Sequence, residues 1–185
     1  MGMMNENWEV MLDDVRLKNE NIFKRFKKNG QEGKFGFVVL LDKQRHAKQI
    51  EALKEDIGTI IAESFKGKRI ASDKRCLRDG DDGGDDFTAG CWILSANSDN
   101  PPFAWDKSIP NKQLTIDDPA QIYRGCRVKV KFRLWAQDNE WGQRVNAQAI
   151  AIQFRGDDEA FGAGTVSAES AAQGFEVSDA GDEGW

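Results

Sequence analysis

Alternating hydrophobic and polar positions recur through most of the chain and predict a protein built mainly of β-strands. A loose alternation over residues 8–18 predicts a first strand, and the segment that begins at Asn19 breaks the pattern. The run 34–41 is rich in β-branched and aromatic residues and follows a turn with Gly30 and Gly33, which is typical of a largely buried strand. Two strands are therefore expected before residue 42.

The period of the pattern changes after Asp42, which is a plausible helix N-cap. Apolar residues then recur at helical spacing up to about Phe65, namely Ile50, Leu53, Ile57, Ile60 and Ile61. This spacing predicts one amphipathic helix. Residues 66–89 are polar and rich in glycine and charge, and predict a long loop or a splayed hairpin.

Three further strands are expected in the second half of the chain. Residues 91–96 form the third, and the prolines within 100–110 favour extended segments after it. Residues 126–135 and 144–155 predict a hairpin that turns at 138–142. Five strands and one helix are the inventory of a small barrel. The predicted fold class is mainly β: a five-stranded OB-fold barrel with one amphipathic helix and a disordered acidic C-terminal tail.

The charge is distributed unevenly and divides the chain in two. The net charge is −5, yet residues 157–185 contain eight acidic residues and no basic one. This leaves 26 basic and 23 acidic residues in 1–156, a net charge of +3. The segment 157–185 also has too little apolar content to offset its ordering entropy. We predict one domain over residues 1–156 and a flexible acidic tail over 157–185.

The strand at 126–135 carries the most informative pattern. Val128, Val130, Phe132 and Leu134 share one face, and the other carries Arg127, Lys129, Lys131, Arg133 and Trp135. Four cations about 7 Å apart match an extended phosphate backbone, and the tryptophan can stack on a base. A solvated strand face is the alternative, but such faces usually mix acids with bases. The pattern favours a nucleic-acid-binding face.

The partner strand at 144–155 leaves two interpretations open. Simple alternation assigns its residues to two opposite faces. One face carries Val145, Ala147, Ala149, Ala151 and Gln153, and the other carries Asn146, Gln148, Ile150, Ile152 and Phe154. The alanines either admit a sugar or base or pack the helix. The remaining predicted nucleic-acid-binding residues are Trp92, Trp105, Trp141, Arg124 and Arg144. Stacking on aromatic side chains is worth about 1–3 kcal/mol per base.

Several classes of site are disfavoured. Cys76, Cys91 and Cys126 lack zinc-ligand spacing and are expected to be free thiols, and His46 is expected to be a solvated helix residue. The acidic run 79–86 lacks EF-hand spacing and favours a solvated loop. No phosphate-binding loop or nucleophile motif occurs, and no apolar run has the length of a membrane span. We expect no enzyme, cofactor, metal, leader peptide or membrane segment.

Ordered motifs give a more specific indication: 77–81 (LRDGD), 89–97 (AGCWILSAN), 101–102 (PP), 122–126 (IYRGC), 135–139 (WAQDN) and 160–162 (AFG). Together they resemble the bacteriophage single-stranded DNA-binding family first catalogued as a domain of unknown function, over residues 8–162. The resemblance implies an OB barrel that coats single-stranded DNA (ssDNA) without strong sequence preference during phage replication and recombination, in the cytoplasm of the infected host. A homodimer is left open. Glu140 and Trp141 stand where relatives have a glycine-rich turn.

The tail also resembles those of phage and bacterial ssDNA-binding proteins. The predicted partner-binding residues are Asp179, Asp182, Glu183 and Trp185. A tethered polyanion competes with DNA for a cationic groove and, once displaced, binds replication or recombination proteins. Two rival hypotheses are an OB-fold protein-interaction module and a metal-dependent nuclease, the latter using Asp79, Asp81, Asp82, Asp85 and Asp86.

Overall fold

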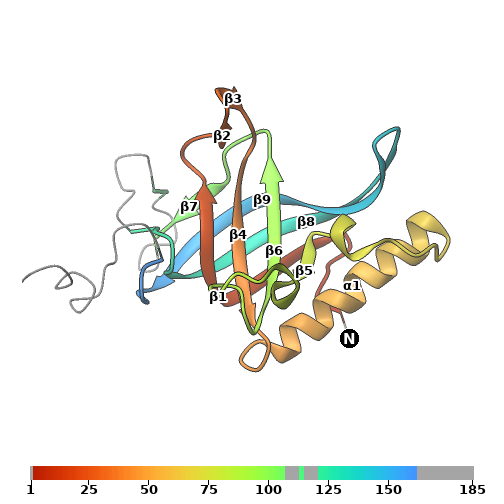
Figure 1. The fold of residues 1–185 in the computed structure, drawn as a ribbon, viewed down its shortest axis with the longest axis horizontal. Coiled ribbons are helices and arrows are strands. Elements are labelled where there is room, and N and C mark those ends of the chain that lie inside the picture. Colours follow the sequence, from red (N-terminus) through yellow and green to blue (C-terminus); the bar gives the residue numbers. More distant parts are fainter. Residues whose placement is uncertain (1, 107–112, 115–120, 162–185) are drawn as a thin grey trace, which may run out of the picture.

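The computed structural model describes residues 2–106, 113–114 and 121–161 of the 185-residue chain (Figure 1). Within these ranges the α-helix is α1 (Ala47–Phe65), and two 3-10 turns are η1 (Ser72–Lys74) and η2 (Gly80–Gly83). The strands are β1 (Glu9–Asn21), β2 (Lys27–Lys28), β3 (Gln31–Glu32), β4 (Phe35–Asp42), β5 (Leu77–Asp79), β6 (Cys91–Ser98), β7 (Phe103–Trp105), β8 (Arg127–Asn139) and β9 (Gly142–Gly156).

Five of these strands close into the predicted OB-type barrel. Antiparallel pairing gives the order β6-β4-β1-β8-β9, and a parallel contact between Asn97 of β6 and Gln148 of β9 joins the ends. β5 and β7 extend the sheet beside β6 and β9, respectively, and β2 and β3 pair in a small hairpin of their own. The fold prediction is confirmed, with short additional strands that the sequence pattern did not separate from loops.

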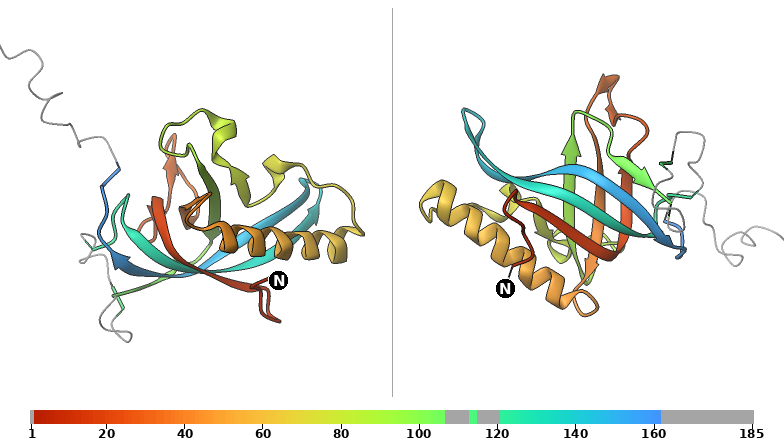
Figure 2. Two further views of the ribbon diagram at one scale, coloured as in Figure 1. Left: turned by 90° about the horizontal axis from the view of Figure 1, so that it is seen from below. Right: turned by 180° about the vertical axis from the view of Figure 1, so that it is seen from behind.

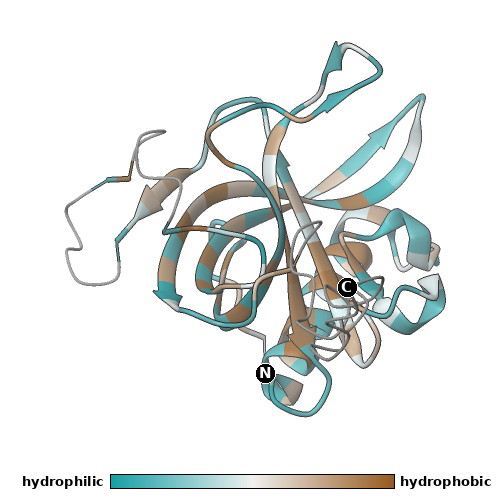
Figure 3. Cartoon of the chain, turned by 60° about the vertical axis from the view of Figure 1, so that its left-hand side comes forward, coloured by the Kyte–Doolittle hydropathy of each residue, from teal (hydrophilic) through white to brown (hydrophobic). Residues whose placement is uncertain are grey.

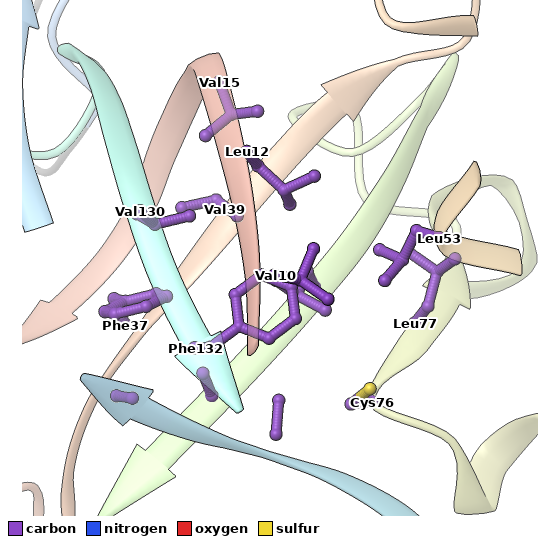
Figure 4. Packing of buried hydrophobic residues seen from close by; sticks show 14 of the residues in the cluster. Val10, Leu12, Val15, Phe37, Val39, Leu53, Cys76, Leu77, Val130 and Phe132 are labelled. Carbon is purple, nitrogen blue, oxygen red and sulfur yellow. The ribbon is translucent and has the colours of Figure 1, made fainter. Parts of the chain in front are cut away.

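Hydrophobic side chains from every barrel strand meet in one core. Val10, Leu12, Val130 and Phe132 lie together inside the barrel (Figure 4). The helix α1 lies across the lower end of the barrel (Figure 2) and packs Leu53 against Leu77 of β5 (Figure 4). The helix thereby covers apolar surface that the strands alone would leave exposed.

The helix begins later than the sequence predicts. Asp42 Oδ1 accepts hydrogen bonds from the backbone amides of Gln44 and Arg45, so Asp42 caps a preceding turn and α1 begins at Ala47. The expectation that His46 is solvated is wrong, because the ring is buried. His46 Nδ1 accepts from the Asp42 amide at 2.8 Å, and Nε2 donates to the Asp14 carbonyl at 2.8 Å. The hydrogen bond between His46 and Asp14 holds the start of the helix against β1.

A β-bulge at Ile150 changes the phase of β9. Lys131 pairs with Ala151 but the next residue, Phe132, pairs with Ala149, so Ile150 has no partner on β8. Simple alternation over 145–154 is therefore wrong beyond the bulge. Ala147 and Ala149 are buried in the core, whereas Ala151 faces outward beside Lys131. The two buried alanines pack in the barrel core, which neither interpretation of the alanine row had stated.

Other boundaries differ by a few residues. β1 continues past Asn19 to Asn21 through a register shift, and the β8–β9 hairpin is longer than predicted and turns at Glu140 and Trp141. The segment 66–89 contains η1, β5 and η2 rather than a plain loop. No helix within the described ranges is long and apolar enough to cross a membrane.

The first residues of the predicted tail lie against the barrel. The Tyr123 hydroxyl donates to Asp157 Oδ1 at 2.8 Å, and the Phe161 amide donates to the Arg124 carbonyl at 2.8 Å. Phe161 also packs edge-on against Phe87, with ring centroids 5.2 Å apart. Residues 157–161 thus form part of the folded surface, and the rest of the predicted tail, 162–185, lies outside the described residues.

Candidate nucleic-acid interface

The face pattern predicted for β8 is present in the structure. Val128, Val130, Phe132 and Leu134 are fully buried. The alternate side chains face outward and form what we call the basic strand, made of Arg127, Lys129, Lys131 and Arg133. Period-two alternation therefore separates core from surface over this strand without interruption.

Neighbouring acids partly neutralise the basic strand. Glu9 of β1 lies opposite Arg133 and accepts from it at 3.0 Å, and its other oxygen lies 3.3 Å from Lys131 Nζ. Hydrogen bonds from Asn5, Arg133 and Lys131 lower the pKa of Glu9, so it stays charged at neutral pH. Two of the four cations therefore share one counter-ion.

Arg127 is engaged by the segment that follows β9. Its Nε donates to Asp158 Oδ2 at 2.8 Å, and Arg16 lies 3.8 Å from the same carboxylate. A backbone hydrogen bond from Glu159 and the contact with Arg127 lower the pKa of Asp158. Lys129, by contrast, has no ion pair among the described residues. Lys129 is thus the cation of the basic strand that is most available to a phosphate.

Trp135, at the far end of the basic strand, faces a second and more basic region. It lines a groove of about 320 Å³ that we call the hairpin cleft. The basic side chains in this cleft are Lys34, Arg75, Arg78 and Arg144, and Asp73 is the one acid among its described lining residues. Its other polar lining is Ser95, Asn97, Gln137 and Asn146. The cleft brings four cations from three separate segments around one exposed aromatic ring.

The hairpin cleft lies on the face where OB folds bind oligonucleotides, namely strands two and three and the loops joining strands one to two and four to five. Here strand three is β6, which contributes Ser95 and Asn97. Lys34 ends the connection from β1 to β4, and Arg144 follows the β8–β9 turn. Topology and charge therefore indicate the same surface.

Two projecting hairpins flank this surface. Both β2–β3 and β8–β9 extend from the same side of the barrel (Figure 1), and both are mainly hydrophilic (Figure 3). The connection 24–34 carries five basic residues and one acid, Glu32. The structure leaves Lys24, Lys27 and Lys28 exposed. An exposed basic arm beside the cleft would attract a polyanion.

The sequence prediction included Trp135 and Arg144 but missed Lys34 and Arg78. Lys34 belongs to the charge run 24–34, whose five basic residues are a sequence signal for a basic patch. Arg78 gave no such signal, because it lies in a polar segment and reaches the cleft only through the pairing of β5 with β6. One of its guanidinium nitrogens, Nη2, lies 3.3 Å from Ser95 Oγ.

The other predicted residues are placed apart from the cleft. Trp92 packs against the α1 side chain Lys54, whose Nζ lies 3.9 Å from the ring centroid. Arg124 donates to the Lys18 carbonyl at 2.9 Å near the end of β1. Trp141 is the most exposed of the large apolar residues that the structure describes, at the β8–β9 tip, and Trp105 lies on β7 beside Phe103. The structure thus distributes these four over separate surfaces.

The acidic run 79–86 is held by lysines. Lys43 Nζ donates to Asp79 at 2.7 Å and to Asp81 at 2.6 Å, and these hydrogen bonds lower the pKa of both carboxyls. Lys18 pairs with Asp85 at 3.3 Å. Among the residues the structure describes, no group of three or more potential ligands is placed to hold a metal ion. The run fits a folded loop rather than a nuclease centre.

The cysteines offer no nucleophile within this surface. Burial raises the pKa of Cys76 to about 12 and that of Cys126 to about 11. Cys91 is half-buried, and burial likewise raises its pKa. All three are free thiols, as the sequence predicts.

Comparison with known proteins identifies the family. A family model described as the ssDNA-binding protein of Enterobacter phage Enc34 matches residues 8–184. The chain belongs to this family. A relative, putative protein p50 of Acyrthosiphon pisum secondary endosymbiont phage 1, is 31% identical over 172 residues, covering 87% of this chain and 91% of its own.

Solved structures agree with the Enc34 assignment. The Enc34 ssDNA-binding protein in complex with ssDNA is 25% identical, with a TM-score of 0.76 over 85% of this chain and 91% of that one. The ssDNA-binding protein gp2.5 of bacteriophage T7 shares the fold at 14% identity and a TM-score of 0.52, covering 85% and 96%. The family resemblance found in the sequence motifs is confirmed, and binding ssDNA is a non-enzymatic function.

Proposed function

We propose that this protein binds single-stranded DNA in the hairpin cleft, without strong sequence preference. The observation that carries the proposal is the convergence of Lys34, Arg78 and Arg144 around the exposed Trp135 on the OB ligand face. Membership of the Enc34 family supports it. The cleft lies between two hairpins, so a strand can enter from the side rather than by its end.

The chemistry of the cleft explains the proposed lack of sequence preference. A base stacks on Trp135 through its π-face, which every base possesses. The three cations attract phosphates, which are the same in every sequence. Asn97 and Asn146 add neutral donors and acceptors that hydrogen-bond to sugars or bases. Affinity then falls as salt rises, because bound phosphates release counterions.

The basic strand continues the proposed site. Lys129, Lys131 and Arg133 lead away from Trp135 on the same face of β8 at intervals of about 7 Å. Phosphates that pass Trp135 can follow these side chains. Arg127 was predicted to bind phosphate as well, but its guanidinium group donates a hydrogen bond to Asp158 instead. We therefore leave Arg127 out of the proposed site.

The biological role proposed is coating of ssDNA during phage replication and recombination, in the cytoplasm of the infected host. Trp185 and the acids Asp179, Asp182 and Glu183 are proposed to recruit replication proteins after DNA displaces the tail. The excess of acids in 157–185 supports competition with DNA for basic surface. Deleting 176–185 should strengthen ssDNA binding at low salt and abolish capture of replication proteins. Unchanged or weaker binding would contradict the competition.

The binding proposal is tested by titration with oligothymidine and a matched duplex, monitored by tryptophan fluorescence at two salt concentrations. We expect strong quenching by the single strand, weakened by salt, and clearly reduced quenching in Trp135→Ala. Trp92→Ala is the control, because Trp92 packs beneath Lys54 away from the cleft. Absence of a response to ssDNA, or an equal response to the duplex, would favour a protein-interaction module instead.

A further inference from the structure

The outer face of the barrel carries a second hollow, apart from the hairpin cleft. It measures about 230 Å³ and lies over β1, β8, β9 and β7. We call it the β7 groove, and its outward-facing side chains are Met11, Trp105, Lys129, Lys131, Ala151 and Gln153. Its volume is below the range of about 300–1,000 Å³ typical of drug-sized ligands. The hollow therefore suits one small group.

Strand register explains why a hollow forms at this place. Met11, Lys131, Ala151 and Phe103 form one row across four strands, and Lys129, Gln153 and Trp105 form the next. Ala151 is the small residue between Lys131 and Phe103. It faces outward only because the bulge at Ile150 shifts the phase of β9. The bulge thus places the short side chain of Ala151 at the floor of the hollow, between larger side chains.

Aromatic and cationic groups line opposite sides of this hollow. Trp105 of β7 lines one side. Phe103 lies next to it, with ring centroids 6.4 Å apart and planes 22° apart, and is more than half exposed. Lys129 and Lys131 of β8 line the other side, and the ammonium group of Lys131 is paired with Glu9. A half-buried tryptophan ring beside lysines offers one surface for a base and another for its phosphate.

The β7 groove is continuous with the proposed DNA path. Trp135 and Lys129 lie six positions apart on β8, a distance of about 20 Å, and Arg133 and Lys131 lie between them. This distance comprises three intervals of about 7 Å between alternate side chains, so DNA whose phosphates follow the same spacing would cover it with about three nucleotides. A single strand leaving the cleft along the basic strand would therefore arrive at Trp105.

We infer that the β7 groove is a second nucleotide-binding subsite, which stacks one base against Trp105 and holds an adjacent phosphate with Lys129. This inference rests on the proposed function, because the DNA reaches the groove from the hairpin cleft. It predicts that the footprint of one protomer extends from the cleft around the outside of β8.

The test compares a ladder of oligothymidines of about 4 to 16 nucleotides, which spans the site sizes known for OB folds. The variant Trp105→Ala combined with Lys129→Ala should bind the longest oligomers roughly 10-fold more weakly, and the shortest as wild type does. Because Trp105 is half-buried, Ala151→Gln provides a second variant that fills the hollow without removing a core contact. Lys48→Ala and Ala62→Gln, both exposed on α1, are the matched controls.

Photocrosslinking gives a direct readout. A long oligomer carrying 5-iododeoxyuridine should crosslink to peptides containing Trp105 or Met11 in the wild-type protein, and not in Ala151→Gln. Unaltered affinity of both variants for long oligomers, or the same loss at every length, would overturn a separate subsite. If the wild-type protein bound no oligomer at all, the proposed function would fail first.

Discussion

Glu9 and Arg133 face each other across the β1–β8 pairing, with a carboxylate oxygen and a guanidinium nitrogen 3.0 Å apart. The same carboxylate also holds Lys131. A strand of DNA that follows β8 must therefore compete with a fixed counter-ion for two of its cations. Electrostatic competition of this kind weakens binding without changing the fold.

Glu9→Gln should accordingly strengthen ssDNA binding, by about 2- to 10-fold at low salt, because it frees two cations for phosphate. The slope of log affinity against log salt should steepen by up to about 1.4, at about 0.7 per added phosphate contact. Fluorescence titration at several salt concentrations measures both. Glu6→Gln, exposed and near the same end of the chain, is the control, and weaker binding by Glu9→Gln would contradict the interpretation.

The hairpin cleft predicts a second salt effect of opposite sign. Lys34→Ala combined with Arg78→Ala should reduce the magnitude of the same slope by about 1.4, since two phosphate contacts are lost. The double variant Lys48→Ala with Lys68→Ala removes as much charge from exposed positions outside the cleft. If both doubles changed the slope equally, the effect would be one of net charge and not of the cleft.

The hydrogen bonds of Lys43 to Asp79 and Asp81 should make the stability of the folded protein depend on pH. These hydrogen bonds lower the folded-state pKa of Asp79 and Asp81, so their stabilising contribution is present above the ordinary aspartate pKa of about 3.9 and is lost as pH falls through the lowered values. Lys43→Met should lower Tm at pH 7, and the difference from wild type should shrink below about pH 3. A difference that stayed constant between these pH values would show that Lys43 acts through its contact with the Trp92 ring instead.

The backbone at Gly125, where the chain meets residues 157–161, has a conformation that requires glycine. Its φ is +108°, and a Cβ there would lie 2.2 Å from the Glu159 carbonyl oxygen. Gly125→Ala should destabilise the protein by about 1–3 kcal/mol and loosen residues 157–161. Chemical denaturation and proteolysis measure the two effects. Gly58→Ala, in α1 with open space around it, should stabilise by about 0.5–1 kcal/mol.

The sequence predicted those features that depend on local periodicity. Alternation over β8 separated its core row from its basic row correctly, because both rows belong to one uninterrupted strand. The same logic failed on β9, where the bulge at Ile150 reverses the faces. A bulge is set by pairing with β8, so periodicity within β9 alone gives no sign of it.

Predictions made from neighbouring residues also failed for single residues whose positions depend on distant partners. His46 lies in a polar stretch, yet it is buried because Asp14, 32 residues earlier, supplies a carbonyl for its ring. Arg78 became a cleft residue only through the pairing of β5 with β6. Neither relationship is encoded by neighbouring residues in the chain.

What the sequence determined by itself is the five barrel strands, the helix, the family and the existence of a basic, aromatic surface, since these follow from local pattern, composition and ordered motifs. Only the tertiary structure decided which cations are available. It set Glu9 beside Arg133 and Asp158 beside Arg127, and it gathered Lys34, Arg78, Trp135 and Arg144 in one cleft. The reason is physical, because charge–charge and stacking interactions depend on distances through space. The closed barrel brings together residues as far apart as Glu9 and Arg133, 124 positions along the chain, a separation that no local pattern contains.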